Sequence, residues 1–376
     1  MKNPRTLLTY HDLSVEVQSS PGEELIEHMH ETVLGTPGGL RYQHTDVADR
    51  LSSLGENYFM FLRKGKKMLG SVGFCRRPAV AAGVEHDSWL IRYFSIKAPM
   101  RSVPGNNHHR KPQQAGSDRA SVLGRFIKPI FANPALLRDG GKSGVAPAVI
   151  FGIVERKNLR SVNFSEQTGL EKVGEVSSFT FSRMIPEKSA RMEVLREAER
   201  QEMQTKIREF YREYTLFNGD SLFRNNHYFV IRQAGRVVAG LQTHPVTWRI
   251  VDFGSRGTTG LVKFLARVPA VRRRLDPEAL RFLAFDGIYC EPGHEAALYE
   301  LMEGVLEREK YYLAMLMMDS GSPLHTIFSE RKRLGLLHQM LGSFEADIRI
   351  RFVNLPDRVR QYYMDHPTYI STYDNS

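Results

Sequence analysis

The chain has 376 residues, of which 41% are hydrophobic and 25% charged, and its formal net charge is +10 at pH 7. This composition is typical of a soluble globular protein, and the length favours about two domains. No apolar run approaches the roughly 20 residues of a membrane-spanning helix, and Met1–Asp12 lacks the apolar centre of a signal peptide. The two cysteines, Cys75 and Cys290, cannot form a disulfide framework and fit a reducing cytoplasm.

The excess of basic residues leaves several partners open. A positive surface attracts nucleic acid, anionic lipid or a polyanionic small molecule, and it also keeps a protein soluble without any ligand. The arginines at 272–274 stand without the aromatic-rich signature of an RNA-binding surface. Nucleic acid is therefore not the favoured partner.

The first half predicts the order strand, helix, hairpin, strand. Short β-branched or alternating apolar runs predict strands, apolar residues at helical spacing predict a helix, and a glycine between two short runs predicts a hairpin turn. In chain order these elements are one or two strands in Thr6–Val17, a helix over Glu23–Leu34, a hairpin of Tyr58–Leu62 and Met68–Cys75, and a strand over Trp89–Ile96. Pro99–Asp118 is polar and predicts a long loop before a helix that ends near Phe131.

The segment Ala148–Arg183 carries the most informative pattern. Ala148–Val154 is a short, continuous apolar run and predicts a buried strand. Helical spacing follows from Asn158, and Gly169 stands where the glycine that ends a helix is expected. An alternating strand follows the glycine.

This order of strand, helix, Gly-Leu and strand resembles the C-terminal half of the GNAT superfamily, the acyl-CoA N-acyltransferases. That family often carries an Asn at the helix start, a small residue three later, a Tyr seven later, and Gly-Phe at eleven and twelve. At these places the chain has Asn158, Ser161, Ser165, Gly169 and Leu170. The departure at Ser165 puts in doubt how a departing thiolate would be protonated.

The second half repeats the predicted order after about 185 residues. A junction near Pro186–Ser189 and a long predicted helix over Arg191–Tyr214 come first. A second hairpin, a strand, a helix, a strand, a helix and a last strand follow: Tyr228–Arg232 with Val237–Thr243, Phe282–Tyr289, Glu295–Arg308, Tyr312–Met318, Ser322–Arg333 and Ile348–Phe352. The resemblance thus implies an α/β (α+β) fold of two tandem GNAT-like domains, residues 1–186 and 187–376, each a mixed, mainly antiparallel sheet flanked by helices.

The resemblance also implies an acyl-CoA site in the first domain. Backbone N–H groups at a helix start can hold a pyrophosphate, an open sheet edge can take the pantetheine arm, and a strand N–H can polarise the thioester carbonyl. The cofactor-binding residues that follow from the family's strand, loop and helix are Phe94, Ser95, Ile96, Arg101, Gly116, Ser117 and Asn158.

The phosphate loop itself has two candidates. Arg101 takes the family's basic position, but Pro104 and Asn106 stand where glycines are expected, and Gln113–Asp118 is the second candidate. In the second half, Cys290–Glu295 places two acids where phosphates would bind, which like charges disfavour. We therefore expect the acyl-CoA in the first domain.

Two residues are candidate catalytic groups. Ser165 stands at the place of the family's Tyr, near the CoA sulfur. Glu85, with His86 and Asp87 beside it, precedes the active-site strand and is a candidate general base by position alone; a surface turn without function is the alternative. A lysine-type amine, with a pKa of about 10.4, must lose its proton before it attacks. No histidine pair has the wider ligand set of a metal site, so no metal is expected.

We predict a cytoplasmic N-acyltransferase that moves an acyl group from acetyl-CoA or another acyl-CoA to the amine of a small molecule or peptide. Two alternatives stay open. One is a non-catalytic binding or scaffold protein that keeps the GNAT fold. The other is a peptidyltransferase-like protein that uses aminoacyl-tRNA, which the positive charge would suit. The acceptor, the acyl chain and the oligomeric state do not follow from the sequence.

Overall fold

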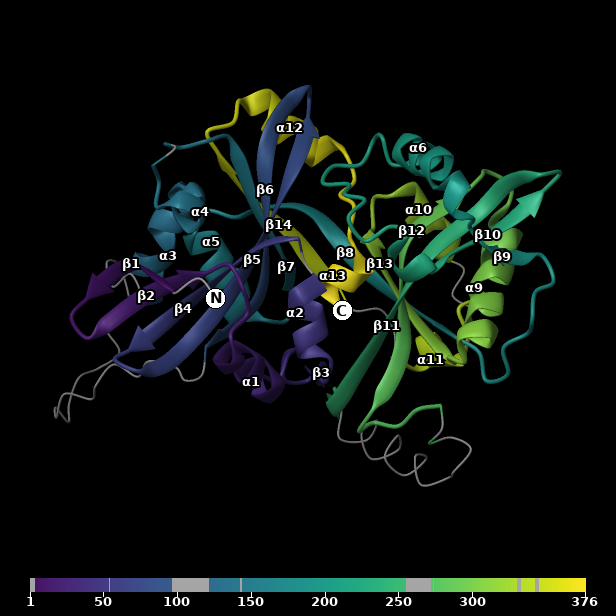
Figure 1. The fold of residues 1–376 in the computed structure, drawn as a ribbon, viewed down its shortest axis with the longest axis horizontal. Helices are drawn as coiled ribbons and strands as arrows, with labels where there is room; N and C mark the ends of the chain where they lie inside the picture. Colours follow the sequence, from purple (N-terminus) through teal and green to yellow (C-terminus); the bar gives the residue numbers. More distant parts are fainter. Residues whose placement is uncertain are drawn as a thin grey trace.

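One mixed sheet runs through both halves of the chain, with helices on both of its faces (Figure 1). The computed structural model describes residues 4–53, 55–96, 122–142, 144–254, 272, 274–329, 333–341 and 345–376. The strands in these ranges are β1 (Arg5–Tyr10), β2 (Leu13–Gln18), β3 (Leu40–His44), β4 (Glu56–Lys64), β5 (Lys67–Ala81), β6 (Val84–Ile96), β7 (Ala148–Glu155), β8 (Glu171–Ser182), β9 (Met192–Val194), β10 (Tyr228–Gln233), β11 (Arg236–Phe253), β12 (Leu280–Cys290), β13 (Leu313–Asp319) and β14 (Glu345–Val353).

The helices of the described residues pack against the sheet, some of them in its two largest cores. Those of the first half are α1 (Glu23–Glu31), α2 (Val47–Ser53), α3 (Val122–Ala132), α4 (Ala135–Asp139) and α5 (Leu159–Gln167). The later ones are α6 (Arg200–Phe210), α9 (Glu295–Glu309), α10 (Pro323–Phe328), α11 (Leu336–Leu341), α12 (Asp357–Asp365) and α13 (Thr372–Asn375), with short 3-10 turns at Glu197–Glu199 and Arg224–Asn226. One core joins α3 to β2 and β4–β7, and the other joins α6 and α9 to β10–β13. Among the residues that the structure describes, no helix combines the length and apolar character needed to cross a membrane.

The two halves have the same strand topology. In the first, β4, β5 and β6 are antiparallel and β7 lies parallel to β6. In the second, β10, β11 and β12 are antiparallel and β13 lies parallel to β12. Each half also has a bulge in the first strand of its parallel pair, at Tyr93 in β6 and Gly287 in β12, both with φ of about +52°. The predicted fold class, a mixed and mainly antiparallel repeated sheet with flanking helices, is confirmed.

The last strand of each half is exchanged. β14 pairs with β7 of the first half, β8 pairs with β13 of the second, and β8 and β14 pair with each other at the centre of the sheet. The strand β3 also crosses over, because it pairs with β11. Each half therefore completes the sheet of the other, and the domain boundary between residues 186 and 187 stays a prediction.

The predicted long helix over Arg191–Tyr214 is wrong. Met192–Val194 is instead the edge strand β9, which pairs with β10, and the helix α6 begins only at Arg200. Pairing with an open sheet edge satisfies the backbone groups of these residues and outweighs their helical spacing. The short elements β3, α2, α12 and α13 were not predicted, because distant parts of the chain hold them in place.

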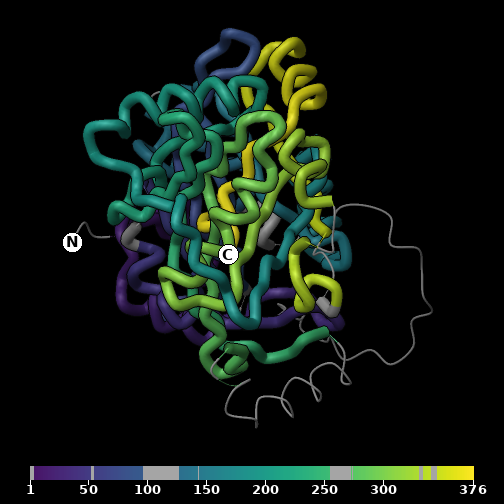
Figure 2. The backbone as a smooth tube through the Cα atoms, turned by 90° about the vertical axis from the view of Figure 1, so that its right-hand side faces the viewer, coloured from purple at the N-terminus to yellow at the C-terminus, as the bar shows by residue number. Residues whose placement is uncertain are grey.

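The chain comes back to the centre of the molecule at its end. Residues 368–374, which we call the returning segment, lie between the two halves, and α13 contacts β12 and β13 and lies close to α2 (Figure 1). Figure 2 shows the C-terminus near the centre of the molecule in the second view as well. The carboxylate of Asp286 in β12 accepts hydrogen bonds from the backbone N–H groups of Thr372 (2.7 Å) and Tyr373 (3.2 Å). Burial, and then the nearby charge of Asp374, raise the pKa of Asp286 to about 6.

The raised pKa of Asp286 makes the stability of the fold depend on pH. The folded state holds this proton more tightly than the unfolded state, so the stabilising contribution is full below the ordinary pKa of 3.8 and is lost as the pH rises through about 6. The free energy of unfolding falls by about 3 kcal/mol over this range. Because Asp286→Asn cannot titrate, we expect the difference in unfolding free energy between wild type and variant to fall by about this amount between pH 4 and 7 in urea titrations. A constant difference would contradict the assignment.

Candidate functional site

The parallel strands β6 and β7 separate part of the way along their length. Their paired residues run from Asp87–Ala148 to Leu90–Phe151 and then stop, although both strands continue. At this point the bulge in β6 places two residues, Tyr93 and Phe94, opposite one residue of β5. A bulge bends its strand and takes one residue out of the ladder. The result is an open gap between β6 and β7.

A cavity of about 190 Å³ lies at this gap. Strands β5, β6 and β7 and helices α3 and α5 line it, and most of the lining side chains are apolar. Phe94 and Phe164 stack at a ring-centroid distance of 5.3 Å on the α5 side. Phe74 and Phe131 meet edge to face at 6.3 Å under α3. The cavity therefore continues from the gap into an apolar space below α3.

Gly152 of β7 lies on the wall of this cavity. A Cβ atom at this position would come 3.5 Å from the Cβ of Ile91, which is ordinary contact. An alanine side chain would therefore fit at this position, whereas a larger side chain would extend into the gap. A glycine inside an otherwise apolar strand is the one sequence signal that could have pointed to this wall.

Helix α5 begins directly after β7, beside the gap. The side chain of Asn158 accepts a hydrogen bond from the backbone N–H of Ser161 (3.1 Å) and so caps the helix. Gly169, with φ +76°, follows the end of the helix. The remaining N–H groups of the first turn are the kind of donors that bind phosphate.

The predicted cofactor-binding residues lie in different places. Phe94 lines the cavity, whereas the hydroxyl of Ser95 lies 3.3 Å from that of Thr32, next to α1. Ile96 is the last residue of β6 and pairs with Gly70. Asn158 acts as the cap described above. Arg101, Gly116 and Ser117 lie outside the described residues, so these positions stay predictions.

The structure does not bring the predicted general base to the cavity. Glu85 is exposed near the beginning of β6, where it pairs with Val80. It lies about 20 Å along the strand from Ile91. Its neighbours are also engaged elsewhere: the Nε2 atom of His86 lies 2.8 Å from the hydroxyl of Tyr363, and Asp87 accepts a hydrogen bond from Arg76. Glu85 lies far from the cavity because β6 and β7 stay paired up to Leu90, and its role as a general base stays a prediction.

Ser165 lines the cavity, but its hydroxyl already donates a hydrogen bond within its own helix. It is 3% exposed and donates a hydrogen bond to the backbone oxygen of Val162, 2.7 Å away in the same helix. We expect Ser165→Ala to lower turnover by at most about tenfold, near 1.4 kcal/mol. Rates of acyl transfer for wild type, Ser165→Ala and Ser165→Tyr check this. A loss of a thousandfold in Ser165→Ala would show that the hydroxyl takes part in the reaction.

A buried charged group that was not predicted from the sequence lies beside the bulge. Arg92 lines the cavity, and its guanidinium lies 3.3 Å from Asp374, which also accepts a hydrogen bond from Arg77 at 2.6 Å. Burial alone would raise the pKa of Asp374, but Arg77 and Arg92 hold it below its usual range. No local pattern joins residues this far apart in the sequence.

Comparison with known proteins supports the fold. No family model and no curated protein sequence matches the chain. Two crystal structures of Saccharomyces cerevisiae N-myristoyltransferase with bound myristoyl-CoA are similar to it. The first has a TM-score of 0.56 at 12% identity and covers 93% of this chain and 84% of that one. The second has a TM-score of 0.54 at 10% identity and covers 93% and 80%.

At these identities the similarity establishes the fold and not the reaction. Together with the repeated strand topology and the paired bulges, it shows that the chain has the tandem GNAT-like fold, as the sequence resemblance implied.

Proposed function

We propose that this protein is an N-acyltransferase that binds an acyl-CoA in the gap between β6 and β7 and passes the acyl group to an amine. The observation that carries the proposal is the gap itself, which opens at the bulge of β6 in a fold shared with an enzyme crystallised with myristoyl-CoA. The activity of that enzyme is not transferred by similarity alone.

The gap fits the pantetheine arm of coenzyme A. Two parallel strands that separate leave backbone N–H and C=O groups that no longer pair with each other, and the amides of the arm can pair with them as an added strand would. The apolar side chains of Ile91, Phe94 and Ile153 flank this path. The start of α5, with its cap at Asn158, lies next to the end of the path where the pyrophosphate would be bound.

The bulge fits the reacting thioester. Tyr93 and Phe94 leave the regular ladder, and their N–H groups are candidates to stabilise negative charge on the carbonyl oxygen. Because the strand already holds these donors in place, little conformational entropy is lost when they bind the oxygen. The acyl group would then extend into the space lined by Phe74, Ile127 and Phe131. This apolar extension supports an acyl group longer than acetyl.

The far side of Tyr93 fits an amine acceptor. His44 is 4% exposed, and its ring lies 6.3 Å from that of Tyr93. Burial, and then the charges of Arg50 and Arg92, hold the pKa of His44 well below its ordinary value. The same positive surroundings would lower the pKa of an amine bound nearby and favour its neutral, reactive form.

Calorimetry and a transfer assay test the proposal together. Acetyl-, octanoyl- and myristoyl-CoA are titrated into the protein, and release of free CoA is then followed with a panel of amines and short peptides. Binding with amine-dependent release of CoA supports the proposal, and tighter binding of the longer chains supports the apolar extension. Binding without release would favour the non-catalytic alternative. Absence of binding for all three compounds would contradict the proposal.

A further inference from the structure

The second half contains the counterpart of the gap between β6 and β7. The parallel strands β12 and β13 pair at Leu283–Ala314 and Ala284–Met315, and the pairing then stops. Gly287, the bulge residue of β12, lies three residues after the last pair, just as Tyr93 lies three residues after Leu90. Both halves therefore open at the same place in their topology, and the second opening would present the same kind of backbone groups to a ligand.

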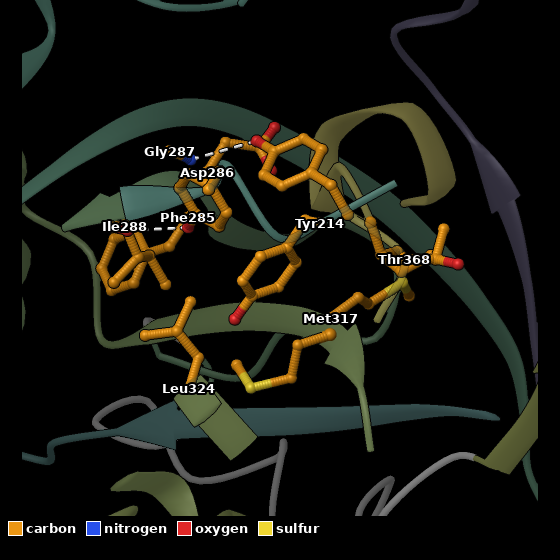
Figure 3. A pocket seen from close by; sticks show the side chains of 12 residues that line it. Tyr214, Phe285, Asp286, Gly287, Ile288, Met317, Leu324 and Thr368 are labelled. Atoms are coloured by element: carbon orange, nitrogen blue, oxygen red, sulfur yellow. Dashed lines mark hydrogen bonds between the residues drawn. The ribbon is translucent and has the colours of Figure 1, made fainter. Parts of the chain in front are cut away.

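In the second half, however, the returning segment occupies this place. The backbone N–H of Gly287, at the bulge of β12, donates a hydrogen bond to the hydroxyl of Tyr369 (3.3 Å; Figure 3). On the opposite strand, the N–H of Met317 donates to the hydroxyl of Thr372 (2.9 Å). These are the two sides of the gap, and one short segment of the same chain bonds to both.

Further contacts fix the segment there. The carboxylate of Asp286 accepts hydrogen bonds from the Thr372 N–H and from the Ser371 hydroxyl (2.9 Å), and Asp319 accepts one from the Thr368 N–H (2.9 Å). Tyr369 is 6% exposed. The cavity that remains among these residues is about 20 Å³, against about 190 Å³ in the first half. That space suits roughly one water molecule.

We propose that the returning segment is an internal ligand of the second gap, where it takes the place that an acyl-pantetheine arm takes in the first. The identity of that arm rests on the function proposed above, whereas the contacts of the segment do not. The consequence is a single acyl-CoA site per chain, in the gap between β6 and β7. Because the segment is tethered, its effective concentration is of the order of millimolar, and a free ligand must compete against it.

The same segment also reaches the first site. Its Asp374 carboxylate bonds to Arg77 and lies 3.3 Å from Arg92, which lines the acyl-CoA cavity. A segment that closes the second gap thus fixes a side chain at the first. The position of Arg92 at the first cavity therefore depends on the returning segment staying in place.

Hydrogen exchange on the full chain tests whether the segment closes the gap. The double variant Tyr369→Phe, Thr372→Val removes only the two hydroxyls that accept from Gly287 and Met317. The matched control is Tyr363→Phe in α12, which loses a buried hydroxyl that lies 2.8 Å from Nε2 of His86 in β6. Neither Tyr363 nor His86 lines the small cavity of the second half. We expect exchange in peptides covering 285–290 and 314–319 to be about tenfold faster in the double variant and unchanged in the control. Equal exchange in the two variants would overturn the proposal.

Binding stoichiometry provides the second readout. Native mass spectrometry of the wild type with myristoyl-CoA should show one ligand per chain at saturation. Two ligands per chain would overturn the internal-ligand proposal while leaving the proposed function in place. If no ligand binds, the proposed function fails, and the exchange rates of the double variant still decide whether the segment closes the second gap.

Discussion

Replacing Gly152 by leucine is expected to weaken acyl-CoA binding by about a hundredfold or more, equivalent to about 2.7 kcal/mol. Gly152 stands on the wall of the cavity where β6 and β7 begin to separate, and a Cβ at this position already touches Ile91. The additional atoms of leucine can only occupy the gap that the pantetheine arm would use. Calorimetric titration of myristoyl-CoA into the folded variant measures the effect.

Gly152→Ala is the matched control for this prediction. Its Cβ would lie 3.5 Å from the Cβ of Ile91, an ordinary contact, so we expect the alanine variant to fold and to bind within a few fold of wild type. Thermal unfolding of both variants separates a loss of binding from a loss of structure. Full affinity in a folded leucine variant would show that the acyl-CoA does not pass between β6 and β7.

Asp374→Ala is expected to lower the free energy of unfolding by about 3–5 kcal/mol. Asp374 is 6% exposed and bonds to Arg77, which is itself 8% exposed, while Arg92 lies on its other side. Removal of the carboxylate leaves buried positive charge without this counter-charge, and that cost is far larger than the cost of losing a surface ion pair. Urea unfolding followed by circular dichroism measures the change.

Asp220→Ala is the control, because Asp220 is the second carboxylate partner of Arg77 at 2.9 Å but its side chain is 55% exposed. A water-exposed pair contributes about 1 kcal/mol or less. Similar losses in the Asp374 and Asp220 variants would contradict the view that the returning segment is held by a buried charge cluster.

Much of the fold could be predicted because its signals are local. The hairpin of β4 and β5, the helix capped by Asn158 and ended by Gly169, and the repeated strand order all follow from patterns within a few residues. The exchange of β8 and β14 could not be predicted in this way. In both strands apolar residues stand among polar and charged ones, a pattern that does not specify a neighbour. Only the packing of the whole chain decides which strand each one pairs with.

The candidate site shows the same division. Ser165, predicted by counting along α5, and Phe94, predicted from the end of β6, both line the cavity. The distance of Glu85 from the cavity could not be predicted, because position in the sequence does not tell how far along β6 the gap begins. Arg92 was missed, because its partner Asp374 comes from the other end of the sequence.

The most direct test of the account is hydrogen exchange of the wild type with and without myristoyl-CoA. We predict slower exchange in peptides covering 91–96 and 151–165, the two strands of the first gap and the start of α5, with no change in 285–290 and 314–319. Protection confined to the second gap, or no protection anywhere in the presence of a saturating ligand, would contradict it.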